Sequence, residues 1–224
     1  MANEIDRERN RLLQEIRAEA WNTRGYTGRA AFDPRVMEAL HRVPRHEFIA
    51  PGSLHLAYAN HPLPIGHGQT ISQPYIVALM TDLIRPEADD VVLEIGTGSG
   101  YQAAVLAELV KRIYSVEIVP ELARAADARL RRLGYDNVEV RSGNGRLGWP
   151  QHAPYDAILV TAAASRIPPA LVAQLKPEAR LVIPVGDPHD AQELIVVERR
   201  EDGSVGQTPV LPVALVPLTG SGGD

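Results

Sequence analysis

The sequence lacks cysteine, has few aromatic residues and contains no long apolar run, and each absence excludes a class of protein. Without cysteine, the 224-residue chain can form no disulfide scaffold, thiolate nucleophile or cysteine-ligated zinc or iron–sulfur site. Aromatic residues make up only 5% of the chain, too few for the stacking platforms that bind single-stranded nucleic acid. No apolar run approaches the roughly 18 residues that a membrane-spanning helix needs, and the charged N-terminus does not resemble a secretory signal.

The sequence also has fewer basic than acidic residues. The chain has 23 lysine and arginine residues against 28 aspartate and glutamate residues, a formal net charge of −5. A protein that binds duplex nucleic acid usually presents a basic surface that replaces counterions, so we expect no nucleic-acid partner. Because no apolar run is long enough to span a bilayer, we also expect no membrane partner. Apolar residues at 45% and charged residues at 23% are ordinary for a globular domain. We expect a cytoplasmic protein that is a monomer.

Helical periodicity dominates the first part of the chain. The predicted helices cover residues 4–22, 34–43 and 75–84. Gly25 and Gly28 are expected to end the first helix. A loop rich in proline, glycine and histidine occupies residues 50–74, and a loop this long inside a domain usually carries function. Residues 1–74 are therefore expected to supply N-terminal helices and a substrate loop.

From residue 91 onward, short apolar strands alternate with helices. The predicted strands cover residues 91–95, 113–117, 138–140, 155–161, 180–185, 193–199 and 210–218, and the predicted helices cover 100–110, 120–133 and 168–175. This alternation is typical of a doubly wound, mostly parallel α/β sheet, which residues 75–219 are expected to form. No helix separates the last two strands, so we expect a C-terminal antiparallel hairpin at a sheet edge. Residues 220–224 are expected to be a tail.

A glycine-rich turn follows the first of these strands. Dinucleotide-binding turns follow the pattern Gly-x-Gly-x-x-Gly, and the third glycine would fall where the chain has Tyr101. An acidic residue followed by glycines at alternate positions is instead the form found in S-adenosylmethionine enzymes. That ligand has no pyrophosphate to bind, and its cationic sulfonium and α-amino groups favour a nearby carboxylate. The expected cofactor-binding residues of this turn are Glu94, Ile95, Gly96, Thr97, Gly98 and Gly100.

The ends of the next two strands add polar groups. Glu117 ends the second strand, 21 residues after Gly96, where a carboxylate can accept hydrogen bonds from both ribose hydroxyls. Asn144 and Gly145 follow the third strand, and the Asn144 side-chain oxygen could accept a hydrogen bond from the adenine amino group. A glycine-rich turn alone can be a packing device. Three successive strand ends with suitable residues favour S-adenosylmethionine as the cofactor.

Six sequence blocks match a known family and span most of the chain. They are Arg42–Phe48, Leu63–Pro74, Val92–Tyr101, Pro154–Ile158, Leu181–Gly186 and Val216–Leu218. Together they resemble the protein-L-isoaspartate (D-aspartate) O-methyltransferase family, and the stretch Gly-Gln-Thr-Ile-Ser-Gln-Pro at 68–74 is the most specific. The resemblance implies a Rossmann-like class I methyltransferase fold. It also implies methylation of the free α-carboxylate of L-isoaspartyl residues in damaged proteins and peptides, which initiates repair through a succinimide.

The resemblance further implies roles for individual residues. Ser72 would be the catalytic residue, and Thr70, Ile71 and Val216 would complete the substrate site with it. Thr219 would lie near the cofactor. The acceptor carboxylate is already ionised at neutral pH, so no general base and no metal is expected. The seven histidines of the sequence show no metal-ligand spacing.

Two departures from the family pattern and two alternative functions accompany this interpretation. Asn144 stands where the family commonly has aspartate, and residues 176–179 replace a usual Gly-Gly turn.

A carboxyl methyltransferase that modifies one dedicated peptide would be expected to carry additional C-terminal recognition sequence. A non-enzymatic protein that binds S-adenosylmethionine would be expected to have lost Ser72 or the glycines.

Overall fold

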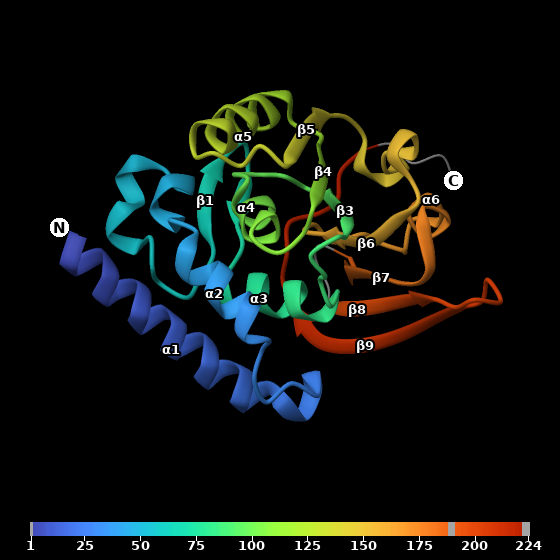
Figure 1. The fold of residues 1–224 in the computed structure, drawn as a ribbon, viewed down its shortest axis with the longest axis horizontal. Coiled ribbons are helices and arrows are strands. Elements are labelled where there is room, and N and C mark those ends of the chain that lie inside the picture. The colour runs from blue at the N-terminus through green and yellow to red at the C-terminus, as the bar shows by residue number, and fades with distance from the viewer. Residues whose placement is uncertain (1, 188–190, 221–224) are drawn as a thin grey trace.

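A seven-stranded mixed sheet forms the centre of the computed structural model, which describes residues 2–187 and 191–220 (Figure 1). The helices are α1 Ala2–Thr27, α2 Pro34–Arg42, α3 Pro74–Leu83, α4 Tyr101–Ala107, α5 Pro120–Arg132 and α6 Pro169–Ala173, with short 3₁₀ turns at Arg45–Phe48, Pro51–Leu56, Gly145–Leu147 and Pro150–His152. The strands are β1 Leu63–Gly66, β2 Gln69–Ile71, β3 Val91–Ile95, β4 Arg112–Glu117, β5 Val138–Ser142, β6 Tyr155–Val160, β7 Leu175–Val185, β8 Gln192–Arg199 and β9 Val205–Val213.

The order of the strands creates a crevice at the carboxyl edge of the sheet. The order is β5-β4-β3-β6-β7-β8-β9, with parallel pairing from β5 to β7 and antiparallel pairing of β7 with β8 and of β8 with β9. The chain builds outward from β3 to β5 and then returns to place β6 on the other side of β3. Connections that leave β3 and β6 therefore diverge, and a doubly wound sheet binds its ligand at such a point.

Side chains of the central strands alternate between two apolar layers. Ala157 and Leu159 of β6 pack into the layer formed with α1 to α4, whereas Ile158 and Val160 pack into the opposite layer with α6. This period of two is the geometry of a strand covered on both faces. It explains why the parallel strands are continuous apolar runs in the sequence rather than alternating ones.

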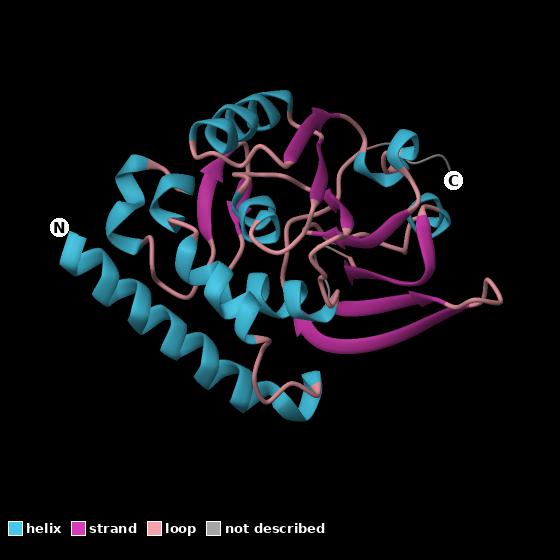
Figure 2. Cartoon of the chain, in the orientation of Figure 1, coloured by secondary structure: helices cyan, strands magenta, loops and turns pink. Residues whose placement is uncertain are grey.

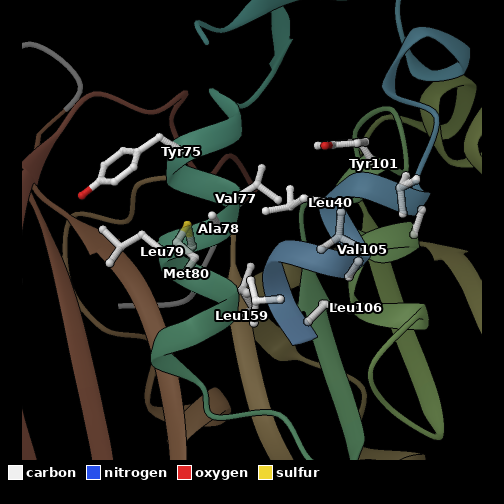
Figure 3. Packing of buried hydrophobic residues seen from close by; sticks show 14 of the residues in the cluster. Leu40, Tyr75, Val77, Ala78, Leu79, Met80, Tyr101, Val105, Leu106 and Leu159 are labelled. Atoms are coloured by element: carbon white, nitrogen blue, oxygen red, sulfur yellow. The ribbon is translucent and has the colours of Figure 1, made fainter. Parts of the chain in front are cut away.

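Helix α3 packs on the first of these layers. Figure 3 shows Val77 of α3 and Leu40 of α2 near Val105 of α4, with Leu106 of α4 and Leu159 of β6 lower in the view. All of these side chains are buried. Helix α3 begins directly after Ser72 and Gln73, so its packing fixes the position of the chain segment that the sequence predicts to bind substrate.

Residues 63–71 form a small antiparallel hairpin, β1 and β2, within the region predicted as a loop. Leu63 and Ile71 anchor it because both side chains are buried. Ile65 reaches the glycine-rich turn, where a Cβ built on Gly98 would lie 3.4 Å from its Cδ1 atom. The hairpin therefore packs against the turn after β3, although Ile65 and Gly98 are 33 positions apart in the sequence.

The predicted fold class is confirmed, including the C-terminal antiparallel hairpin of β8 and β9, whose turn extends from the rest of the domain in Figure 2. Three boundaries were wrong. Helix α1 continues through Gly25 and ends only before Gly28, whose φ of 65° suits glycine. Strand β9 covers Val205–Val213 rather than 210–218. Strand β7 begins at Leu175, within the helix predicted for 168–175.

Residues 221–224 of the expected tail lie outside the described part of the chain. Among the described residues, no helix is long and apolar enough to cross a membrane.

Candidate active site

A cavity opens at the carboxyl ends of β3, β4 and β6, where the sheet topology places the crevice. The hairpin residues 69–72 and the C-terminal residues 216–219 form its other walls. The predicted site residues that line it are Thr70, Ile71, Ser72, Ile95, Gly96, Thr97, Gly98, Glu117, Gly145, Val216 and Thr219. Glu94, Gly100 and Asn144 lie outside this lining.

Gly96 is the one position of the turn where a side chain is excluded by both conformation and space. Its φ is 94°, and an added Cβ would lie 2.3 Å from Oγ1 of Thr161. Thr161 follows β6, and its hydroxyl donates to the carbonyl of Gly96 at 2.6 Å. The hydrogen bond therefore ties the turn after β3 to the end of β6. Sequence reasoning missed Thr161, whose only signal was its place directly after an apolar strand.

Glu117 lies at the end of β4 and holds the glycine-rich turn. Its carboxylate accepts from the backbone N–H of Gly98 at 2.8 Å and from that of Val119 at 2.9 Å. The side chain is buried and lines the cavity. One carboxylate thus fixes the turn and supplies acceptor atoms at the cavity wall.

Glu94 lies behind the cavity rather than on its wall, and it heads a chain of hydroxyl groups. Ser115 of β4 donates to Oε2 of Glu94, and Thr97 contacts Ser115 at 2.6 Å between hydroxyl oxygens. Because the serine proton goes to the carboxylate, the Thr97 hydroxyl donates to Ser115. Complete burial raises the pKa of Glu94 from 4.5 to about 8. Its Oε1 atom is buried without a hydrogen-bond partner among the described residues.

The remaining small and polar residues of the predicted site are explained largely by packing. A Cβ on Gly145 would lie 2.3 Å from Cγ2 of Ile95, so this position needs glycine. Gly100 has a φ of 89° and precedes α4, with Leu130 of α5 only 3.3 Å from an added Cβ. Asn144 caps the 3₁₀ turn that follows it, because its side-chain oxygen accepts from the backbone N–H of Arg146 at 3.0 Å. The structure therefore gives Asn144 a local capping contact.

Arg45 supports the hairpin side of the cavity, and sequence reasoning assigned it no role. Its guanidinium is fully buried and donates through Nη2 to the Ser72 carbonyl at 2.9 Å. It lies 4.7 Å from the ring centroid of Tyr101, a cation–π distance. Burial lowers the pKa of Arg45. Arg45 lies in the block Arg42–Phe48 that resembles the family, but nothing in the local sequence pointed to its contact with Ser72.

Val216 joins the cavity through a backbone bridge that the sequence does not reveal. Its carbonyl accepts from the N–H of Ala163 at 2.8 Å, and Leu218 donates back to the Ala163 carbonyl at 2.7 Å. Ala163 follows β6, so the bridge brings the C-terminal segment to the same sheet edge as Gly96. Residues 210–218 do not form one continuous strand, because β9 ends at Val213 and this bridge begins after it.

The altered turn at residues 176–179 is a bulge within β7. Pairing with β6 jumps from Leu175 to Arg180, and the residue with positive φ is Glu178, at 62°. The Glu178 side chain accepts from the backbone N–H of Glu201 at 3.1 Å, which anchors it to the β8–β9 turn. The departure from Gly-Gly is therefore accommodated at Glu178 and not at Ala179.

No group of residues in the described part of the chain has the composition and geometry of a metal site.

Comparison with known proteins gives the family. Residues 20–223 match the family described as Protein-L-isoaspartate(D-aspartate) O-methyltransferase (PCMT). The chain belongs to this family. It is 57% identical over 212 residues to Protein-L-isoaspartate O-methyltransferase 2 of Syntrophobacter fumaroxidans, covering 95% of this chain and 86% of that one. It is 59% identical over 209 residues to the protein of the same name from a Polaromonas species, covering 93% and 99% of the two chains.

Solved structures agree with the fold. A protein-L-isoaspartate O-methyltransferase superposes with a TM-score of 0.81 at 26% identity, and the match covers 95% of this chain and 66% of that one. A Plasmodium falciparum structure described as a protein-L-isoaspartate O-methyltransferase in complex with S-adenosyl-L-homocysteine has a TM-score of 0.74 at 24% identity, covering 93% and 96%. The family and its relatives show that the activity is O-methylation at protein L-isoaspartate.

Proposed function

We propose that the chain methylates the free α-carboxylate of L-isoaspartyl residues in damaged proteins and peptides, using S-adenosylmethionine. The observation that carries this proposal is the shared cavity: the glycine-rich turn after β3 and the hairpin residues 70–72 line the same space. A cofactor on the turn would therefore meet an acceptor held by the hairpin. The family match supports the chemistry, and the Plasmodium falciparum relative's complex supports the choice of cofactor.

The residues at the strand ends fit S-adenosylmethionine. Glu117 presents a carboxylate at the cavity wall, as the ribose hydroxyls require. Gly98 leaves room for a ligand, because the one atom within 4 Å of an added Cβ belongs to the Ile65 side chain. Glu94, two residues before Gly96, adds a buried Oε1 atom that has no hydrogen-bond partner among the described residues. We assign the cofactor contacts to Ile95, Gly96, Thr97, Gly98, Glu117, Gly145 and Thr219, with Glu94, Gly100 and Asn144 acting from behind them.

The acceptor side supplies donors rather than bases. A carboxylate nucleophile is ionised at neutral pH and needs only to be held in line with the methyl group. We assign its orientation to the Ser72 hydroxyl and to the backbone N–H of Val216, because the Val216 carbonyl already accepts from Ala163. Thr70 and Ile71 shape the same wall. Arg45 is a positioning residue that fixes the Ser72 backbone from the buried side.

When bound, the cofactor supplies an electrophilic methyl group on a sulfonium. The acceptor oxygen would form a bond to that methyl group as the bond between the methyl group and sulfur breaks. A neutral ester then replaces the carboxylate. The following backbone nitrogen of the substrate then displaces methanol and closes a succinimide, which water opens to a mixture of aspartyl and isoaspartyl bonds. These last steps take place in the substrate alone.

Product analysis tests the proposal. An isoaspartyl peptide incubated with the protein and S-adenosylmethionine should first gain one methyl group, then lose methanol to give the succinimide, and finally yield some aspartyl peptide. Chromatography coupled to mass spectrometry follows all four species. A methyl group that survives mild base would be no ester and would contradict the assignment. The expected cytoplasmic location and monomeric state are further proposals, which fractionation and sedimentation measurements test.

A further inference from the structure

A second cavity continues from the first along the C-terminal segment. Four residues line both of them: Thr70, Ser72, Thr161 and Val216. From Ser72 the second cavity extends between the start of α3, residues 211–216 and one side chain of α1. A polypeptide whose isoaspartyl carboxylate reaches Ser72 has its neighbouring residues beside this second cavity. We call it the flanking groove.

The flanking groove is lined mostly by apolar side chains. They include Pro62, Ile76, Leu211, Pro212, Val213, Leu215 and Val216. Among its described lining residues, Glu19 is the only one with a charged side chain. Helix α1, which carries Glu19, lies beside α3 and the end of β9 in the fold (Figure 1). A single carboxylate in an apolar groove is an unusual arrangement, since such groups are normally paired when they lose water.

Neutral amides hold the Glu19 carboxylate. Asn60 donates to Oε2 at 2.7 Å, and Gln73 donates to both oxygens at 3.2 and 3.3 Å. No lysine, arginine or histidine within ion-pair distance of Glu19 occurs in the described ranges 2–187 and 191–220. Partial burial is the main cause that raises the pKa of Glu19, and the amide hydrogen bonds oppose it. Asn60 is itself fixed, because its side-chain oxygen accepts from the N–H of Tyr75 at 3.0 Å.

The carboxylate is therefore preorganised but not neutralised. Gln73 directly follows Ser72 in the chain, so Glu19 is hydrogen-bonded to the immediate neighbour of the proposed catalytic residue, and all three residues line the groove. A cation brought by the ligand would complete the missing half of an ion pair, and the apolar walls would strengthen the attraction by excluding water. A lysine or arginine side chain has both the charge and an apolar stem that suits these walls.

We propose that Glu19 makes the flanking groove a specificity subsite that selects a lysine or arginine close to the isoaspartyl residue of the substrate polypeptide. This inference rests on the proposed function, because it assigns the groove to the same substrate chain. A segment of the substrate polypeptide occupies the groove, and the negative charge of Glu19 complements the positive charge of its lysine or arginine.

Matched isoaspartyl peptides test the subsite. In each peptide, one position within two residues of the isoaspartyl group is lysine, glutamine or glutamate, and kcat/KM for methylation is measured at low ionic strength. The wild type should prefer lysine over glutamine by about fivefold at the position that reaches Glu19, mainly through KM, as for one partly buried ion pair. Raising the salt concentration should reduce the preference.

Substitutions on α1 separate charge selection from a structural role. Glu19→Gln should remove the lysine preference, and Glu19→Lys should favour the glutamate peptide. Glu19→Asp keeps the charge and should keep the preference even where the amide contacts weaken. Glu15→Gln, one turn earlier on α1 and outside the groove lining, removes the same charge and should leave the preference unchanged.

Two results would overturn the subsite. One is a wild-type protein that methylates the lysine, glutamine and glutamate peptides equally at every position. The other is a lysine preference that persists in Glu19→Gln. The glutamine peptide distinguishes this failure from a failure of the proposed function. If the wild type methylates that peptide, the function holds and only the subsite is rejected.

Discussion

The two sides of the cavity are built in different ways. The cofactor side is made by consecutive strand ends, where Gly96 and Glu117 are fixed by hydrogen bonds to Thr161 and Gly98. The acceptor side is assembled from distant segments: Ser72 precedes α3, whereas Val216 arrives through a bridge to Ala163. A binding site for a common cofactor can thus be read from one local motif. The site that selects the substrate depends on long-range packing.

The largest expected effect on ligand binding lies on the cofactor side, at Gly96. Gly96→Ala would force a side chain onto a φ of 94° and place its Cβ 2.3 Å from Oγ1 of Thr161. Strain of this kind costs about 1–3 kcal/mol before the clash is counted. We expect binding of S-adenosylhomocysteine, measured by calorimetry, to weaken at least about 100-fold, which corresponds to about 2.7 kcal/mol. Gly52→Ala, where an added Cβ meets nothing within 4 Å, is the matched control. Unchanged binding in Gly96→Ala would contradict the claim that the local geometry of the glycine-rich turn builds the cofactor side.

Ser72 should show the opposite profile. A hydrogen bond to a charged group contributes about 1.5–3 kcal/mol, so Ser72→Ala should lower kcat for isoaspartyl methylation by about 10- to 150-fold. Affinity for the cofactor should stay within about twofold, because the hydroxyl is assigned to the acceptor. Ser53→Ala, outside both cavities, should change neither quantity. A large loss of cofactor affinity would move Ser72 to the cofactor side.

The buried Glu94 carboxyl should make the stability of the folded protein depend on pH. Its pKa is raised from 4.5 to about 8, so the folded state holds this proton between those values while the unfolded state releases it. The contribution to stability is complete below pH 4.5 and is lost as the pH rises through about 8, with an upper limit of about 5 kcal/mol. Denaturant unfolding without ligand should therefore show the free energy of unfolding falling from pH 5 to pH 9.

Glu94→Gln should flatten that profile, because the amide carries no proton to lose. The same substitution at Glu193, an exposed residue of β8, should leave the slope unchanged. An identical pH slope in the wild type and in Glu94→Gln would show that the buried carboxyl is not the source.

The smallest expected effect is at Asn144. Its side-chain oxygen caps the turn at Gly145–Leu147, and aspartate caps such turns equally well. Asn144→Asp should therefore change cofactor affinity by less than about threefold in a calorimetric titration. A tenfold gain would show that this position contacts the adenine directly, and it would restore the importance of the departure from the family pattern.

The same contrast explains what could be predicted from the sequence. Strand β3 and its turn were predictable because apolar runs and glycine spacing report local geometry. The ends of α1 and β9 were not, because Gly25 is tolerated inside a helix packed on the domain and pairing with β8 decides where β9 begins. Ser72 was suggested by family resemblance and not by its surroundings. Arg45, Thr161 and Glu19 acquire roles only through contacts across the fold.

Labelling of paired peptides tests the central claim most directly. Two peptides of identical sequence, one with an L-isoaspartyl residue and one with the normal aspartyl residue, are each incubated with the protein and S-adenosylmethionine carrying a labelled methyl group. The account predicts base-labile label in the isoaspartyl peptide and none above background in its aspartyl counterpart. Equal labelling of both peptides, or labelling of neither, would contradict it.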